Sequence, residues 1–135
     1  DGGCMVGNLV LVALWDDASV AIFNKDGELS LITGSPGGSL IPAAILRVVT
    51  GVIDFELDIG QATMLPRVHK DWPTTGILYE RTLNADSIRG IRNIGHKMTP
   101  EHTMGSTQSI HIIDGVNYGY ADLRRPNASV STQAN

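Results

Sequence analysis

The sequence predicts a layered α/β or α+β sandwich, and three observations lead to this fold class. Short runs of apolar and β-branched residues, which favour strands, outnumber the segments with helical periodicity. Asp-Gly pairs at residues 26–27 and 114–115 separate such runs, as in tight hairpins. The two longer helical segments lie between pairs of predicted strands. Sheets and helices arranged in this order bury their apolar faces against each other in layers.

The first part of the chain is predicted to be a meander of strands. With 135 residues the sequence has the length of one domain with a modest core. Strands are predicted at residues 9–14, 20–23 and 29–33, and the turn at residues 24–27 joins the last two. The third strand leads directly into a glycine-rich turn.

A strongly apolar helix is predicted at residues 40–55, after that turn. Ser39 is expected to cap it, and Pro42 suits the first turn, where a missing N–H does no harm. The apolar residues at helical spacing indicate a mostly buried helix; they are Ile41, Ile45, Val48, Val52 and Phe55. The narrower polar strip consists of Arg47, Thr50, Gly51 and Asp54.

The remaining elements are shorter. They are expected at residues 59–64 (helix), 77–80 (strand), 86–94 (helix), 109–113 and 117–121 (strands). Pro66 ends the first helix, because the residue before a proline avoids the helical conformation. Asn84 or Asp86 caps the second helix and Gly95 ends it. The last two strands form a hairpin.

The composition excludes several classes of function. A net charge of −4 and the lack of a basic cluster argue against a nucleic-acid partner. No apolar run reaches the length of a transmembrane span. Cys4 is the single cysteine, so an internal disulfide framework is excluded. The four histidines show no metal-ligand spacing, so no metal site is expected.

The most informative motif is the glycine-rich turn at residues 33–39, with the sequence TGSPGGS. The adjacent glycines Gly37 and Gly38 free two backbone N–H groups to point at one spot. The positive end of the following helix favours negative charge at that spot. Such a pair of donors stabilises the oxyanion of an acyl transfer. The sequence therefore predicts an oxyanion hole, but no convincing nucleophile lies beside it.

Six segments resemble, in order and spacing, the C-terminal part of the small catalytic subunit of the gamma-glutamyltransferase (gamma-glutamyltranspeptidase) family. They are TGSPGGS (33–39), VIDF (52–55), LPRVH (65–69), GHK (95–97), MGSTQS (104–109) and YGYAD (118–122). The first and fifth are the most specific. The resemblance covers residues 19–125, which leaves residues 1–18 as a diverged N-terminal segment. Residues 126–135, small and polar, are predicted to be a flexible tail.

The resemblance implies an N-terminal-nucleophile hydrolase fold, a four-layer αββα sandwich of which this chain is one part. It implies a precursor that cuts itself into a heterodimer, whose small subunit begins with a nucleophilic threonine. The large subunit is then the expected partner and covers the apolar helix. Gamma-glutamyl amides such as glutathione are the implied substrates, with transfer to water or amines. No metal or organic cofactor is implied, and the family suggests a periplasmic or extracellular location.

Two positions depart from the family pattern. No threonine precedes Thr33, so the nucleophile is expected outside this sequence. The family has a Ser-Ser pair that binds the substrate's α-carboxylate at the positions of Asp16 and Asp17. Ionised aspartates cannot donate hydrogen bonds and they repel a carboxylate. The substrate therefore differs here, or residues 1–18 diverge from the family.

Other residues are assigned to the surroundings of the oxyanion hole. Ser35 is a candidate both for substrate contact and for hydrogen bonding within its own loop. Arg67 is expected to anchor a buried carboxylate, and Ser106 to support the core near the site. Asp122 and the arginines at 124 and 125 are candidates for ion pairs with the partner subunit.

Two alternatives to a gamma-glutamyltransferase follow from the same residues. The chain could belong to a cephalosporin or glutaryl acylase, or to a relative that transfers poly-glutamate chains. Asp16 and Asp17 suit a substrate without an α-carboxylate at that position. The other alternative is an inactive fragment with a structural role.

Overall fold

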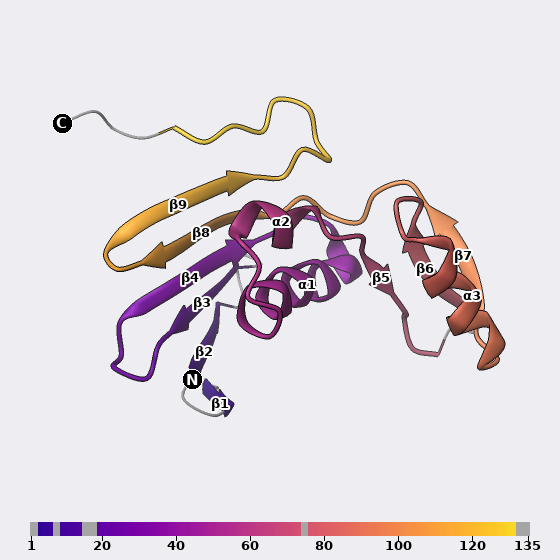
Figure 1. The fold of residues 1–135 in the computed structure, drawn as a ribbon, viewed down its shortest axis with the longest axis horizontal. Coiled ribbons are helices and arrows are strands. Elements are labelled where there is room, and N and C mark those ends of the chain that lie inside the picture. The colour runs from indigo at the N-terminus through magenta and orange to yellow at the C-terminus, as the bar shows by residue number, and fades with distance from the viewer. Residues whose placement is uncertain (1–2, 7–8, 15–18, 74–75, 132–135) are drawn as a thin grey trace.

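Two β-sheets organise the computed structural model, which describes residues 3–6, 9–14, 19–73 and 76–131. The larger sheet is antiparallel and has the strand order β1-β2-β3-β4-β8-β9 (Figure 1). Its strands are β1 (Gly3–Val6), β2 (Leu9–Leu14), β3 (Ser19–Phe23), β4 (Leu29–Gly34), β8 (Gln108–Ile113) and β9 (Val116–Ala121). Strands from both ends of the sequence thus meet where β4 pairs with β8.

Helices α1 (Ile41–Ile53) and α2 (Ile59–Met64) cover one face of this sheet, and a short 3₁₀ turn (Gly38–Leu40) precedes α1. The core lies between them. Its buried members are Val20, Ile22 and Leu31 from the sheet and Ile45, Val48, Val52, Ile59 and Ala62 from the helices. Burying a side chain of the size of Ile22 contributes about 1.5–3 kcal/mol. The sandwich of sheet and helices that the sequence predicts is confirmed.

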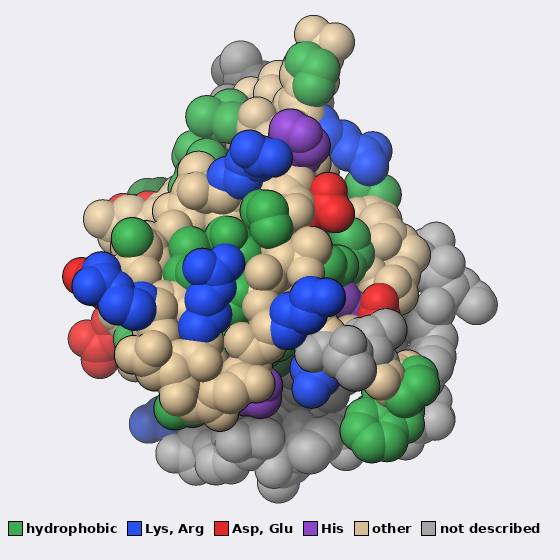
Figure 2. Space-filling model, turned by 90° about the vertical axis from the view of Figure 1, so that its right-hand side faces the viewer, with side chains coloured by type: hydrophobic (Ala, Val, Ile, Leu, Met, Phe, Trp, Pro, Cys, Tyr) green, Lys and Arg blue, Asp and Glu red, His purple; other side chains and the backbone are tan. Residues whose placement is uncertain are grey.

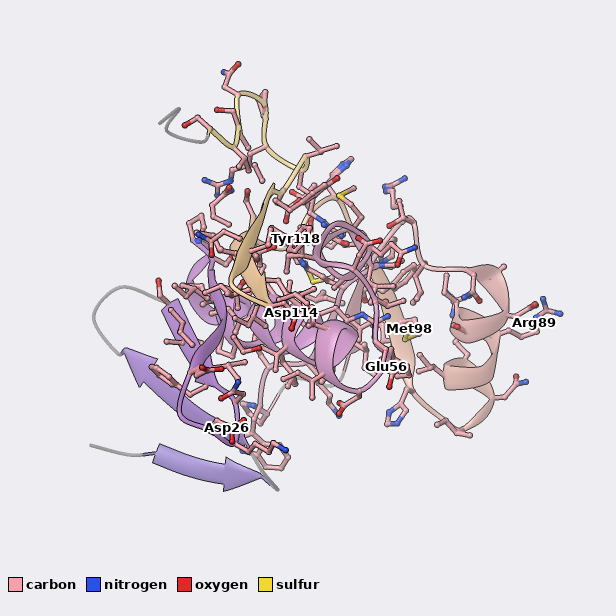
Figure 3. All side chains as sticks on the ribbon, turned by 60° about the vertical axis from the view of Figure 1, so that its left-hand side comes forward. Asp26, Glu56, Arg89, Met98, Asp114 and Tyr118 are labelled. Atoms are coloured by element: carbon pink, nitrogen blue, oxygen red, sulfur yellow. The ribbon has the colours of Figure 1, made fainter. Side chains whose placement is uncertain are left out.

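The smaller sheet consists of β5 (Val68–His69), β6 (Gly76–Glu80) and β7 (Lys97–Glu101). Strands β6 and β7 are parallel and are connected by α3 (Ala85–Asn93). Figure 3 shows Met98 of β7 on the inner side of α3 and Arg89 on its outer side, pointing away from the molecule. The segment after β7 returns to the larger sheet as β8 (Figure 1).

Basic side chains are conspicuous on the face that carries α3 (Figure 2). In and beside α3, Arg81, Arg92 and Lys97 are exposed, and Arg89 pairs with Asp86 at 2.7 Å. Helix α3 is amphipathic: its polar side faces solvent, and none of its residues is fully buried. None of the helices in the described ranges is long and apolar enough to cross a membrane.

Local sequence signals for turns and caps are confirmed at several elements. The Asn24 side chain accepts hydrogen bonds from the N–H groups of Asp26 and Glu28, which closes the first hairpin. A cap that was not predicted is Asp58 of α2, whose Oδ1 accepts from Gln61 N–H at 2.8 Å. Asn84 caps α3. Helix α2 spans the predicted residues.

The prediction for α1 is wrong in three respects. Ser39 is exposed and caps nothing, because a 3₁₀ turn starts at Gly38 and neither helix start has a side-chain cap bond. Phe55 lies beyond the end of α1 and is 64% exposed. Gly51 is buried against α2 rather than part of a polar strip, since a Cβ there would lie 2.8 Å from Ala62 Cβ.

The covering of α1 also differs from the prediction. The sheet of this chain, rather than a partner subunit, covers the side that carries Ile45, Val48 and Val52. The opposite side is not buried, because Leu46 is 61% and Ile53 is 39% exposed. Strands β1, β5 and β7 were not predicted. Strand β7 is polar and contains Pro100, which is tolerated at the edge of a sheet.

We expect Gly51→Ala and Gly90→Ala to change the free energy of unfolding in opposite directions. At Gly51 the added methyl overlaps Ala62, and overpacking of about 1–3 kcal/mol outweighs the better helix propensity of alanine. At Gly90, within α3, a Cβ has no neighbour within 4 Å, so alanine stabilises by about 0.5–1 kcal/mol. Chemical denaturation of both variants measures the difference, and equal effects would contradict the close packing of α1 on α2.

Candidate active site

The predicted oxyanion hole is a turn between β4 and α1. Gly37 has φ 142° and Gly38 has φ 58°, which are both left-handed conformations that favour glycine. Both residues are exposed, and neither N–H has a hydrogen-bond partner among the described residues. The carbonyl of Gly37 accepts from Leu40 N–H at 3.2 Å. Two unpartnered donors therefore stand at the positive end of α1, where negative charge is favoured.

A second loop, which contains Gly105 and Ser106, is hydrogen-bonded to this turn. Ser35 is 4% exposed, and its Oγ accepts from Ser106 N–H at 3.0 Å and donates to the Pro36 carbonyl at 2.9 Å. Gly105 has φ 72°, and a Cβ there would lie 2.6 Å from Ser35 Oγ. Only glycine therefore allows the two loops to approach this closely. The role of Ser35 in loop hydrogen bonding is confirmed, while its contact with a substrate stays a prediction.

The second loop is in turn held by Arg67, which is fully buried. Its Nη1 donates to the Met104 carbonyl at 2.6 Å and its Nη2 lies 2.6 Å from Asp122 Oδ2. The same carboxylate oxygen accepts from Thr107 N–H at 2.9 Å. The predicted structural pairing of Arg67 with a buried carboxylate is confirmed, but a single guanidinium nitrogen makes the ion pair.

Glu80 and Arg124 form the bidentate pair of the site. Arg124 Nε and Nη2 each donate to one Glu80 carboxylate oxygen at 2.7 Å. Glu80 also accepts from Arg67 N–H and from Met104 N–H, both at 3.0 Å. Arg124 Nη1 lies 3.2 Å from Asp122 Oδ1, which joins the two pairs into one cluster. We call Arg67, Glu80, Asp122 and Arg124 the charge cluster.

The electrostatics of the charge cluster follow from burial and from the close opposite charges. Burial alone raises the pKa of Asp122, but the N–H groups of Arg124 and Thr107 and the Arg67 guanidinium hold that pKa below its ordinary value. Burial, and then the positive charge of Arg124, lower the pKa of Arg67. Burial also opposes the charge of Arg124, yet the Glu80 carboxylate raises its pKa.

Two assignments to a partner subunit are wrong. Asp122 is fully buried and the Arg124 side chain is 8% exposed, and both pair within this chain. Arg125 is exposed, so its pairing with a partner stays a prediction. Glu80 was missed as a site residue. The available signal was a carboxylate at the end of the apolar strand 77–80, where a charge needs a buried partner.

The other predicted site residues have different outcomes. Ser106 is 2% exposed and its N–H donates to Ser35 Oγ, while its support of a catalytic site stays a prediction. Asp16 and Asp17 lie outside the described residues. Among the described residues no three metal-binding side chains gather. Burial lowers the pKa of His111, and His69 Nε2 lies 2.7 Å from Asp71 Oδ1.

The chain is similar in sequence and in fold to known proteins. A family model described as gamma-glutamyltranspeptidase matches residues 18–132. The glutathione hydrolase proenzyme of Escherichia coli is 39% identical over 107 residues, which are 78% of this chain and 18% of that protein. A mutant gamma-glutamyltranspeptidase of Helicobacter pylori is 31% identical with a TM-score of 0.71, over 75% of this chain and 57% of that one.

A cephalosporin acylase from Bacillus halodurans shares the fold, with a TM-score of 0.79 and 22% identity over 87% of this chain and 22% of that one. The sheet and its helices are part of an N-terminal-nucleophile hydrolase fold. Within this class, the chain belongs to the gamma-glutamyltranspeptidase family. It spans less than a fifth of the Escherichia coli relative and 57% of the Helicobacter pylori chain.

We expect the stability of the protein to fall in acid because of Asp122. A carboxyl whose pKa is lower in the folded state stabilises the fold above its unfolded pKa of about 4, and this contribution is lost as the pH falls through the folded pKa. Asp122→Asn should flatten the stability profile below about pH 4. At neutral pH it should cost about 3–5 kcal/mol, since Arg67 loses its counter-charge.

Urea denaturation between pH 2 and 7 measures this dependence. Asp26→Asn is the control, because Asp26 is an exposed carboxylate in the first hairpin turn. An unchanged acid profile in Asp122→Asn would contradict the assignment.

Proposed function

We propose that this chain provides the oxyanion hole of an enzyme that transfers or hydrolyses the gamma-glutamyl group of amides such as glutathione. The observation that carries the proposal is the turn with two unpartnered N–H groups, at Gly37 and Gly38, before α1. Membership of the gamma-glutamyltranspeptidase family supports it. Curated relatives carry the name glutathione hydrolase, which supports hydrolysis of such amides.

In this proposal a threonine hydroxyl from a segment outside this sequence attacks the amide carbonyl of the substrate. Its α-amino group takes the hydroxyl proton. The new carbon–oxygen bond places negative charge on the former carbonyl oxygen, which the N–H groups of Gly37 and Gly38 stabilise. The intermediate collapses, the carbon–nitrogen bond breaks, and the amine leaves with the proton. Water or another amine then releases the gamma-glutamyl group from the threonine.

The partner in this proposal is the large subunit of the same precursor. The second face of the larger sheet supports an apolar contact there. Ala21, Ile32 and Ile110 lie side by side across β3, β4 and β8, and Ile110 is 42% exposed. An αββα sandwich requires a second sheet against such a face. At β9 the row ends at Gly119, which Val130 of the C-terminal segment approaches.

The substrate class is tested with the complete enzyme and two anilides. We expect faster release of aniline from a gamma-glutamyl anilide than from a glutaryl anilide, which lacks the α-amino group and keeps the carboxylate. A preference for the glutaryl compound would favour the acylase alternative. No turnover, and no covalent adduct with a reactive glutamine analogue by intact-mass spectrometry, would favour the inactive fragment.

The oxyanion hole is tested by Gly37→Ala. Few L residues adopt φ 142°, so a methyl group forces the turn to rotate and displaces its N–H groups. We expect the kcat for the gamma-glutamyl anilide to fall about 100-fold, as for loss of an oxyanion donor.

The matched control is Gly115→Ala at the tip of the last hairpin. Gly115 has φ 76° with no neighbour of its Cβ within 4 Å, so alanine costs about 1 kcal/mol of stability there. Its kcat should stay within about twofold of the wild type, because the hairpin tip lies outside the site. Equal kcat values in both variants would contradict the role of Gly37.

A further inference from the structure

The orientation of the Gly37 N–H is set by a hydrogen bond at the other end of its peptide group. The Pro36 carbonyl belongs to the same planar unit as the Gly37 N–H, and in a trans peptide the two point in opposite directions. Ser35 Oγ donates to that carbonyl at 2.9 Å. The buried Ser35 therefore holds the carbonyl inward, and the N–H is turned outward.

We propose that Ser35 is a positioning residue, whose hydroxyl orients the Gly37 N–H for the oxyanion. The inference rests on the proposed function, since it assigns a cause to the geometry of that site. Rotation of the Pro36–Gly37 peptide would turn the carbonyl toward the substrate and break the bond to Ser35. The neighbouring peptide is held in the same way by the main chain, because the Gly37 carbonyl accepts from Leu40 N–H at 3.2 Å.

Ser35 can hold the Pro36 carbonyl in one direction because its own side chain is held in one rotamer. Ser106 N–H donates to its Oγ at 3.0 Å, and this bond directs the hydroxyl proton to the Pro36 carbonyl. Gly105 leaves no room for another arrangement, since its absent Cβ would lie 2.6 Å from Ser35 Oγ. The charge cluster holds the backbone of Met104 and Thr107, the residues on either side of Gly105 and Ser106.

The same bonds argue against direct contact between Ser35 and a substrate. Its single hydroxyl proton is donated to Pro36, and one lone pair accepts from Ser106. What remains is an acceptor on a side chain that is 4% exposed. An acceptor cannot bind a carboxylate or an oxyanion. Ser35 therefore acts through the peptide that it holds.

The test compares Ser35→Ala with Thr33→Val in the complete enzyme. Thr33 is a matched control, because it is also buried, lies within β4, and its hydroxyl bonds Ser109 Oγ at 2.8 Å rather than a group of the Pro36–Gly37 peptide. We expect both variants to lower the melting temperature to a similar extent. Only Ser35→Ala should lower the single-turnover acylation rate, by about 10- to 100-fold, because its oxyanion donor is misoriented.

Binding of the product in the ground state distinguishes a positioning role from a merely structural one. A structural defect would weaken binding and acylation together. The Ki of the product L-glutamate should stay within about threefold in Ser35→Ala, since an oxyanion donor acts in the transition state. Ser35→Cys, with a weaker donor of similar size, should show an intermediate rate, and it replaces the alanine variant where that variant does not fold. A crystal structure of the alanine variant should show the Pro36–Gly37 peptide rotated.

The outcomes distinguish this inference from the proposed function. A wild-type enzyme that cleaves no gamma-glutamyl amide would overturn the proposed function itself. An active wild type with an unchanged acylation rate in Ser35→Ala would overturn the positioning role alone. An equal loss of rate in Thr33→Val, or a parallel loss of glutamate binding in Ser35→Ala, would also overturn it.

Discussion

The charge cluster is the interaction on which the rest of the structure depends. Its two arginines and two carboxylates come from the segment between α2 and β5, the end of β6 and the chain after β9, and they neutralise each other in a buried place. Arg67 and Glu80 also bind the backbone of Met104, which lies between the two sheets in sequence. Through Glu80, these bonds tie the smaller sheet to the loop that leads into the larger sheet.

The energetics of buried ion pairs indicate that the charge cluster positions backbone groups more than it adds to the free energy of unfolding. Removing one partner of a buried ion pair costs several kcal/mol, whereas replacing the whole pair with apolar residues is often neutral or stabilising. Apolar residues would fill the space, but they would not set the direction of individual carbonyl and N–H groups. Backbone groups of residues 104 and 107 are bound directly, and residues 105 and 106 carry that order to Ser35. A short series of hydrogen bonds thus connects the charge cluster to the glycine turn and fixes the backbone of that turn.

Local features could be predicted from the sequence, and features that join distant segments could not. The Asp-Gly turns, the Pro66 stop and the Asn84 cap act within a few residues, so the elements that they bound were predicted closely. Strand β7 is polar, and its pairing with β6 depends on the packing of α3. The pairs of the charge cluster join residues 55 and 44 positions apart, so no periodicity reveals them. Gly51 was misplaced for the same reason, because its neighbour Ala62 belongs to another helix.

The bond from Arg67 to the Met104 carbonyl also closes a long excursion of the chain. The smaller sheet and α3 lie between Arg67 and Met104 in the sequence, and the Arg67 guanidinium brings the two ends of this segment together. Glu80 is the residue of this segment that joins the charge cluster. At the far end of this segment, Gly95 is exposed, and a Cβ added there would have no neighbour within 4 Å. A dye, an affinity handle or a surface anchor attached there would report on the protein, or immobilise it, while the glycine turn keeps its shape.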